Sequence, residues 1–296
     1  MSDLHPPSIA AALGSPTAQD SFLPASIVFV GGGNMARSLI GGLIDRGGTA
    51  RSILVSEPFQ EARLALATRF GVRVGNDNAE AAAHASTLVL AVKPQVMRGV
   101  CASIRESLHA DAVVVSIAAG ITSRQLDDWL GGGRAVVRCM PNTPALVGAG
   151  ATGIFANANT SEAQLERARA LMSAVGITVQ IHDESLMDVV TALSGSGPAY
   201  VFLLAQAMQA GAEAQGLPPA AARVLTAQTL FGAARMLIED TEDAAALRAR
   251  VTSPGGTTQA AVEALQGGGF EPLLASAIQA ATRRGRELAR AAEGAA

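Results

Sequence analysis

Hydrophobic residues from position 26 onward fall into short runs, and the longer stretches between the runs carry apolar residues at helical spacing. This alternation is typical of βαβ units and a parallel sheet, so we expect an α/β domain. The expected strands are residues 27–30, 53–56, 87–92, 112–117 and 136–139, with two weaker ones at 153–156 and 178–181. The expected helices are residues 36–45, 60–70, 95–108 and 123–130.

The pattern changes after about Asp183, where the strand signal ends. Before that point, Ser161 and Gln164 stand at capping-box spacing and predict the start of one more helix. After it, long segments rich in Ala, Leu and Gln are broken by Gly and Pro at 216–219, 253–256 and 267–269. We expect a loose extension over residues 1–24, the α/β domain over 25–183 and an all-α domain over 184–296.

Composition narrows the class of protein. With 49% hydrophobic and 16% charged residues the chain can build a large core, which excludes the disordered class. Aromatic residues make up only 3%, so the core is aliphatic, as in parallel strands buried on both faces. The net charge is -3 and no basic stretch resembles a nucleic-acid footprint, so we expect no nucleic-acid partner.

Cysteine usage and the N-terminus indicate a cytoplasmic protein. Cys101 and Cys139 lie far apart without C-x-x-C spacing, which excludes a disulfide framework and gives no metal signature. The first 24 residues contain no Lys or Arg and no continuous apolar run, so they do not read as a signal peptide.

One segment, residues 189–212, is uncharged over a length that could span a bilayer. Gly195, Gly197 and Pro198 interrupt it, and no Lys or Arg follows Arg169 before Arg223 to orient it. We therefore expect no membrane partner and predict a buried helix at a domain or subunit interface.

A glycine-rich turn follows the first strand and opens the first helix, with the sequence GGGNMA in a G-x-G-x-x-A pattern. Gly31 would permit the tight turn, Gly33 would let a pyrophosphate approach the backbone, and Ala36 would keep the helix close to the sheet. The pattern predicts dinucleotide binding; a glycine-rich turn without a ligand is the alternative.

Glu57 stands at the end of the second strand, 26 positions after Gly31. An acid at this point can bond the adenosine ribose 2′-hydroxyl and repel the 2′-phosphate of NADP, so the local pattern favours NAD. The alternative is an exposed acid that touches nothing.

Further polar loops follow the later strands. Lys93 is the only lysine among 22 basic residues and follows the third strand. A single lysine at this place suggests a site that needs a compact ammonium group. The alternative is that a lysine occurs at this helix start by chance. SIAAG and RCMPNTPA follow the next two strands, while LSGSGPAY and VTSPGGTT lie in the helical part. A loop such as VTSPGGTT can hold a carboxylate through hydroxyls and backbone N–H groups.

Six segments, GGGNMA, AVKPQ, SIAAG, RCMPNTPA, LSGSGPAY and VTSPGGTT, occur in this order between positions 31 and 258. This set resembles the pyrroline-5-carboxylate reductase family, the last enzyme of proline synthesis. The resemblance implies a Rossmann domain, a helical domain that intertwines with a second subunit, and homodimers often assembled as a decamer of five dimers. It implies reduction of 1-pyrroline-5-carboxylate to L-proline with NADPH.

The resemblance also implies site residues. With Glu57 from the strand-end argument, the cofactor residues are Gly31, Gly33, Asn34, Met35, Ala36, Asn78, Ala91, Val92, Lys93, Pro94, Ile117, Ala118 and Ala119. The substrate residues are Glu184, Ser196, Ser253, Gly255, Gly256, Thr257 and Thr258.

The family resemblance and the local residues predict different cofactors: the resemblance implies NADPH, whereas Glu57 favours NAD. Family members that use NADPH often place a small hydroxyl residue where this chain has Glu57. Arg37 and Arg63 could compensate the carboxylate, so we expect NADPH to be retained and NADH to be used as well.

The expected chemistry needs no strong general acid, because the cyclic imine can enter as the iminium. This fits the candidate loops, which contain none of the four histidines. We assign Thr258 to the ring nitrogen, the 255–257 amides and Ser253 to the carboxylate, and Lys93 to the nicotinamide side or a bound water.

Two alternatives remain open. A hydroxyacid dehydrogenase of the same architecture would use a lysine on the first helices of its second domain, and that helix has none here. A regulator that binds NAD(P) without turnover would not need the polar VTSPGGTT loop.

Overall fold

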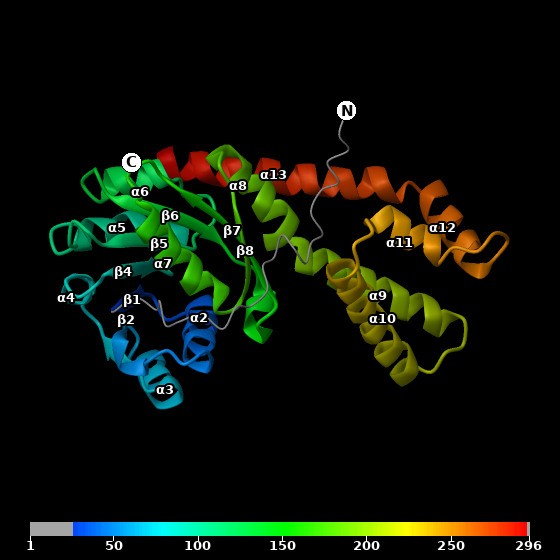
Figure 1. The fold of residues 1–296 in the computed structure, drawn as a ribbon, viewed down its shortest axis with the longest axis horizontal. Helices are drawn as coiled ribbons and strands as arrows, with labels where there is room; N and C mark the ends of the chain where they lie inside the picture. The colour runs from blue at the N-terminus through cyan, green and yellow to red at the C-terminus, as the bar shows by residue number, and fades with distance from the viewer. Residues whose placement is uncertain (1–25, 295–296) are drawn as a thin grey trace. The chain divides into compact units, whose positions relative to one another are not determined.

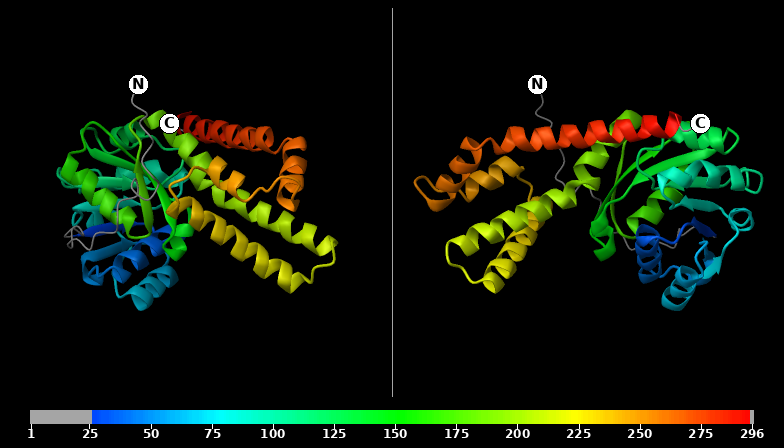
Figure 2. Two further views of the ribbon diagram at one scale, coloured as in Figure 1. Left: turned by 45° about the vertical axis from the view of Figure 1, so that its right-hand side comes forward. Right: turned by 180° about the vertical axis from the view of Figure 1, so that it is seen from behind.

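The computed structural model describes residues 26–294, so the extension predicted over residues 1–24 lies outside the described residues. The described chain forms two compact units. Residues 26–196 with 278–294 make up the sheet unit, and residues 197–277 make up the helical unit. Figures 1 and 2 show the elements of each.

The sheet unit is built on eight strands in the order β3-β2-β1-β4-β5-β6-β7-β8. These strands are β1 (Ile27–Val30), β2 (Ile53–Ser56), β3 (Arg73–Gly75), β4 (Thr87–Leu90), β5 (Val113–Ser116), β6 (Ala135–Met140), β7 (Gly150–Ala156) and β8 (Gly176–Gln180). The first six run parallel, and β7 pairs antiparallel with β6. The order 3-2-1-4-5-6 is that of the Rossmann fold, which confirms the predicted α/β class.

Helices cover both faces of this sheet (Figure 1). They are α2 (Asn34–Asp45), α3 (Gln60–Phe70), α4 (Asn78–Ala82), α5 (Pro94–Ile104), α6 (Ser123–Trp129), α7 (Glu162–Ser173) and α8 (Met187–Val190), with short turns η1 (Ala50–Ser52), η2 (Thr143–Val147), η3 (Glu184–Leu186) and η4 (Thr191–Gly195). One apolar cluster contains side chains of α2, α3 and α7, and a second contains side chains of α4, α5 and α6. Because both faces are covered, β1, β2, β4 and β5 are buried along their whole length.

Both cysteines lie in this core as free thiols. Burial raises the pKa of the Cys101 thiol to about 12 and also raises the pKa of Cys139. Burial therefore disfavours the thiolate, which is the reactive form of the side chain.

The sheet unit continues to Ser196, beyond the boundary predicted after Asp183. The segment stays on the sheet because the Asn142 side-chain amide donates to the Ser194 carbonyl at 3.0 Å. A Cβ on Gly195 would lie 2.8 Å from Met140, so the backbone packs closely there. The SGSGP segment begins inside a π turn, η4, in which the Ser196 N–H donates to the Thr191 carbonyl at 2.8 Å.

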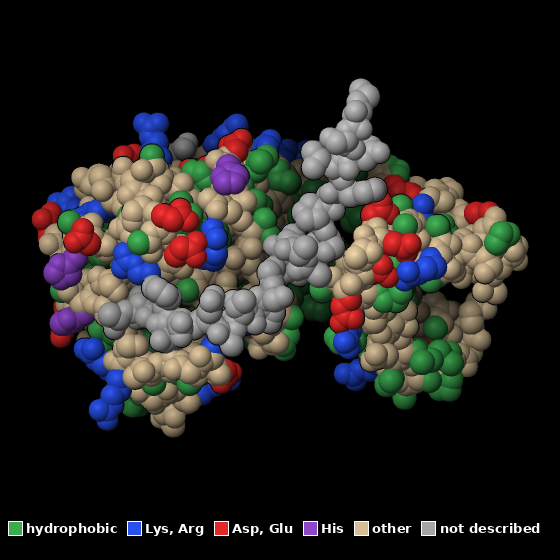
Figure 3. All heavy atoms as spheres, in the orientation of Figure 1, with side chains coloured by type: hydrophobic (Ala, Val, Ile, Leu, Met, Phe, Trp, Pro, Cys, Tyr) green, Lys and Arg blue, Asp and Glu red, His purple; other side chains and the backbone are tan. Residues whose placement is uncertain are grey.

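The helical unit contains α9 (Gly197–Ala214), α10 (Pro219–Glu239), α11 (Ala244–Arg250), α12 (Thr257–Gly267) and the start of α13 (Phe270–Gly294). Helices α9 and α10 lie side by side and reverse direction near Gly216, which has φ +92. Large side chains on both helices are 47–67% exposed: Val201, Phe202, Leu203, Val224, Leu225 and Phe231. Figure 3 shows hydrophobic side chains gathered on the surface of this unit.

The stretch Glu184–Ala214 has the length and composition of a membrane-crossing helix, with a mean hydropathy of 1.3. Within the described chain only 11% of its apolar window is buried. The described residues therefore do not supply the burial that we predicted for this helix.

Candidate active site

The turn between β1 and α2 is the tightest part of the site. Gly31 has φ +98, a left-handed conformation that favours glycine, and its N–H donates to the Ser56 carbonyl at 2.8 Å. A Cβ on Gly31 would lie 2.7 Å from the Ala91 carbonyl oxygen. The turn is therefore fixed between the ends of β2 and β4, where the strand order reverses.

The start of α2 fits a dinucleotide pyrophosphate. Gly33 is the N-cap, no side chain of the described residues caps the helix, and the space where its Cβ would stand is open to 4 Å. The next residues, Asn34 and Met35, begin the helix, and Ala36 is fully buried against the sheet. Free N–H groups at a helix start favour a bound anion, and an absent Cβ permits close approach.

Glu57 is built into the same turn and is only 8% exposed. One carboxylate oxygen accepts from the Gly32 N–H at 2.9 Å, and the other accepts from the Phe59 N–H at 3.1 Å. The alternative of an exposed acid that touches nothing is therefore wrong. The ribose contact predicted for Glu57 stays a prediction.

Two arginines bind the backbone around Glu57. Arg37 Nε donates to the Gly32 carbonyl at 3.0 Å. Arg63 Nη1 donates to the Glu57 and Pro58 carbonyls, each at 2.7 Å. Both arginines are thus held on the backbone close to Glu57 in the chain, and the charge compensation expected from them stays a prediction.

Asn78 joins the site through β2. It is the first residue of α4, and its side-chain oxygen accepts from the Ser56 hydroxyl at 2.7 Å. Because Ser56 also receives the Gly31 N–H on its carbonyl, Asn78 is tied to the glycine turn through one residue.

The AVKP segment continues from β4. The Ala91 N–H donates to the Val30 carbonyl at 2.9 Å, and Val92 packs against one apolar cluster. Lys93 is exposed and forms the N-cap of α5, with Pro94 in the first turn of that helix. Lys93 therefore lies at the carboxyl edge of the sheet, as predicted, with its side chain available to a ligand.

The loop after β5 carries Ile117, Ala118 and Ala119. The Ile117 N–H donates to the Leu90 carbonyl and the Ala118 N–H to the Ser116 hydroxyl, both at 3.3 Å. This loop and the AVKP segment follow neighbouring strands, so the structure brings these predicted cofactor residues to one edge of the sheet.

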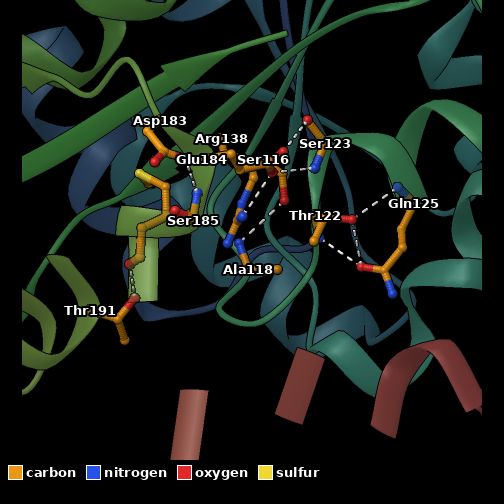
Figure 4. Close-up of polar contacts among 11 residues, drawn as sticks. Ser116, Ala118, Thr122, Ser123, Gln125, Arg138, Asp183, Glu184, Ser185 and Thr191 are labelled. Atoms are coloured by element: carbon orange, nitrogen blue, oxygen red, sulfur yellow. Dashed lines mark hydrogen bonds and ion pairs between the residues drawn. The ribbon is translucent and has the colours of Figure 1, made fainter. Parts of the chain in front are cut away.

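A partly buried ion pair lies next to this loop (Figure 4). Arg138 on β6 donates to Glu184 at 2.8 Å, and Ser123 at the start of α6 donates to both oxygens of the same carboxylate. We predicted neither Arg138 nor Ser123 as a site residue. The signal was an arginine inside an otherwise apolar strand, which needs a buried partner.

The predicted substrate residues of VTSPGGTT lie in the helical unit, and Ser196 ends the sheet unit. Gly255 has φ +71, and Gly256 is the N-cap of α12. Gly255 N–H donates to Gln259 at 2.7 Å and Gly256 N–H to the Ser253 carbonyl at 3.0 Å, so two of the amides assigned to the carboxylate are already bonded. The amides of Thr257 and Thr258, in the first turn, have no acceptor within their own helix.

The fold and the glycine turn define a dinucleotide-dependent oxidoreductase. Residues 26–120 match the family model described as NADP oxidoreductase coenzyme F420-dependent, and residues 184–288 match the one described as pyrroline-5-carboxylate reductase dimerisation. A pyrroline-5-carboxylate reductase of Pseudomonas aeruginosa is 51% identical over 263 residues, covering 89% of this chain and 96% of that protein. The chain belongs to the pyrroline-5-carboxylate reductase family.

Solved structures agree with this assignment. A pyrroline-5-carboxylate reductase from Coxiella burnetii has a TM-score of 0.86 at 41% identity and covers 89% of this chain and 98% of its own. The Plasmodium falciparum enzyme, solved with NADP bound, has a TM-score of 0.81 at 26% identity and covers 91% and 100%. Family membership removes the hydroxyacid dehydrogenase alternative.

Gly31 and Gly33 make a matched pair for testing this site. We expect Gly31→Ala to lower thermal stability, because the new Cβ meets the Ala91 backbone and φ is positive. We expect Gly33→Ala to keep wild-type stability, since its Cβ position is open, yet to weaken NADPH binding. Thermal unfolding and calorimetric titration measure the two effects; equal stability loss in both variants would contradict the assignment.

Proposed function

We propose that this chain reduces 1-pyrroline-5-carboxylate to L-proline with NAD(P)H. The observation that carries the proposal is the glycine turn at the switch point of the sheet, in a chain of this family. The test is oxidation of NADPH on addition of 1-pyrroline-5-carboxylate, with L-proline identified as product. Tight NADPH binding without imine-dependent oxidation would favour the regulator alternative.

The chain's own residues supply binding and orientation. When bound, the reduced nicotinamide supplies the hydride that the imine carbon accepts. The free Thr257 and Thr258 amides suit the substrate carboxylate, and the Thr258 hydroxyl accepts a hydrogen bond from the protonated ring nitrogen. Because the imine can enter as the iminium, positioning accounts for most of the rate. Lys93 orders the nicotinamide side or a bound water.

For the cofactor we propose NADPH, with NADH also used. The Glu57 carboxylate disfavours a 2′-phosphate through like-charge repulsion. Arg37 and Arg63, which hold the backbone around Glu57, offset part of that repulsion. The structure of a relative with NADP bound supports the nicotinamide class.

We propose a homodimer formed through the helical unit, assembled in turn as five dimers. The match to the dimerisation model over 184–288 supports the dimer. The exposed apolar side chains of α9 and α10 are covered in this proposal by a second copy of the chain and not by lipid.

Replacing Thr258 tests the substrate loop. We expect Thr258→Ala to lower kcat/KM for the imine by about tenfold to a hundredfold, since a hydrogen bond to a charged group contributes roughly 1.5 to 3 kcal/mol. NADPH affinity should be unchanged, and Thr258→Ser, which keeps the hydroxyl, should retain most of the activity. Wild-type imine reduction by the alanine variant, or loss of cofactor binding, would show that the loop has another role.

Two substitutions of Glu57 separate its charge from its support of the turn. Glu57→Gln removes the charge but keeps an oxygen for the Gly32 N–H, whereas Glu57→Ser removes both. We expect both variants to raise the NADPH-to-NADH ratio of kcat/KM by at least several-fold, because each removes the repulsion. Steady-state kinetics with both nucleotides give this ratio. A ratio that stays at the wild-type value in both variants would mean that Glu57 does not read the ribose.

The dimer is tested by sedimentation. At micromolar concentration we expect no monomer, because the exposed faces of α9 and α10 need a protein cover. Phe202→Glu and Phe231→Glu place a charge on these faces and should dissociate or unfold the protein. A stable, active wild-type monomer would overturn the proposed interface.

A further inference from the structure

Both carboxylate oxygens of Glu184 are hydrogen-bonded within the sheet unit, although the resemblance places this residue among the substrate residues. We propose that Glu184 is a positioning residue: through Ser123 and Arg138 it holds the 117–122 loop, which carries three of the predicted cofactor residues, in its binding conformation. The inference depends on the proposed function in one respect: it assumes that this loop is part of the nicotinamide dinucleotide site.

Both oxygens of the Glu184 carboxylate are already hydrogen-bonded. Glu184 Oε1 accepts from the Ser123 N–H at 2.6 Å and from Arg138 Nη1 at 2.8 Å, while Oε2 accepts from the Ser123 hydroxyl at 2.7 Å. Figure 4 shows these three bonds converging on one side chain. With both oxygens held by short, charge-assisted bonds, the carboxylate is occupied by the protein itself.

The two partners of Glu184 lie at the two ends of the 117–122 loop. Ser123 is the first residue of α6 and directly follows the loop, while Ser116 directly precedes it as the last residue of β5. Arg138 is the register partner of Ser116 on the neighbouring strand. Glu184 thus connects the far end of the loop to the strand beside its near end, so both ends are fixed relative to each other.

Burial makes this connection stiff. Ser116, Ser123 and Arg138 are 1%, 4% and 7% exposed, and the Glu184 side chain is 23% exposed. A buried charge that loses its partner stays desolvated, so the two side chains hold each other in place far more firmly than an exposed pair would. The loop cannot shift at Ser123 without breaking the contact.

Helix α13 contacts the same loop at Gly120. Gly120 has φ +73, and a Cβ there would lie 3.4 Å from the Ala289 backbone nitrogen of α13. The same helix packs on the segment that carries Glu184, since a Cβ on Gly285 would lie 3.0 Å from Asp188 Oδ1. The loop therefore packs against α13 at Gly120, while Glu184 bonds to Ser123 at its end.

Two carboxylates, Glu184 and Asp188, interact with the charge of Arg138. Burial raises the pKa of the Asp188 carboxyl, and the nearby Arg138 and Arg286 guanidinium groups act in the opposite direction. Arg138 pairs directly with Glu184 at 2.8 Å, and its charge also acts on Asp188.

The experiment compares Glu184→Gln with Glu162→Gln, a matched control on α7 that has no part in this cluster. Hydrogen–deuterium exchange of the cofactor-free protein reads the loop directly, and we expect faster exchange over residues 116–126 only in Glu184→Gln. The NADPH Kd from calorimetric titration should rise about tenfold, as expected when a binding group is displaced. The imine KM at saturating NADPH should stay within about twofold of wild type.

A second, milder variant keeps the inference testable if Glu184→Gln does not fold. Ser123→Ala removes one bond to the carboxylate and should by itself raise the NADPH Kd and speed exchange over residues 116–126. Where Glu184→Gln does fold, the effects of the two substitutions should not be additive. A raised imine KM with unchanged exchange and unchanged NADPH Kd would overturn the inference and make Glu184 a substrate ligand. Exchange and NADPH affinity are read without turnover, so failure of the proposed reaction would not be mistaken for failure of this inference.

Discussion

The backbone approach at Gly31 is the constraint on which the site depends. Its positive φ and its contact with the Ala91 carbonyl bring the start of α2 to the edge where β2 and β4 end. The Gly32 N–H that follows donates to Glu57, so the same turn also fixes the acid for which we predict the ribose contact. We expect any larger residue at Gly31 to push this turn away from the Ala91 backbone at the end of β4.

Much of the fold follows from short-range patterns. The predicted bounds of β1, β2 and α3 agree with the structure, because each is a continuous buried run or a full-length helix with clear ends. The capping box of Ser161 and Gln164 is also confirmed. Strand β3 and helix α4 were missed, since three half-exposed residues and a five-residue helix carry too little periodicity to detect.

The site was only partly predictable, and the difference lies in sequence separation. The glycine turn is local, so its residues could be named from the motif alone. The bond from Glu57 to Gly32 and the ion pair from Arg138 to Glu184 join residues 25 and 46 positions apart, which no local pattern reveals. The 253–258 loop was placed correctly at a helix start, but the Gln259 side chain that occupies the Gly255 amide was not foreseen.

We propose that the chain passes a hydride from a dinucleotide at the carboxyl edge of its sheet to a cyclic imine. The most direct measurement uses NADPH carrying deuterium on the transferred position of the nicotinamide, with 1-pyrroline-5-carboxylate as substrate and mass spectrometry of the product. The account predicts L-proline with a single deuterium on the ring carbon that was double-bonded to nitrogen. Unlabelled proline, or no proline from an enzyme that binds NADPH, would contradict it.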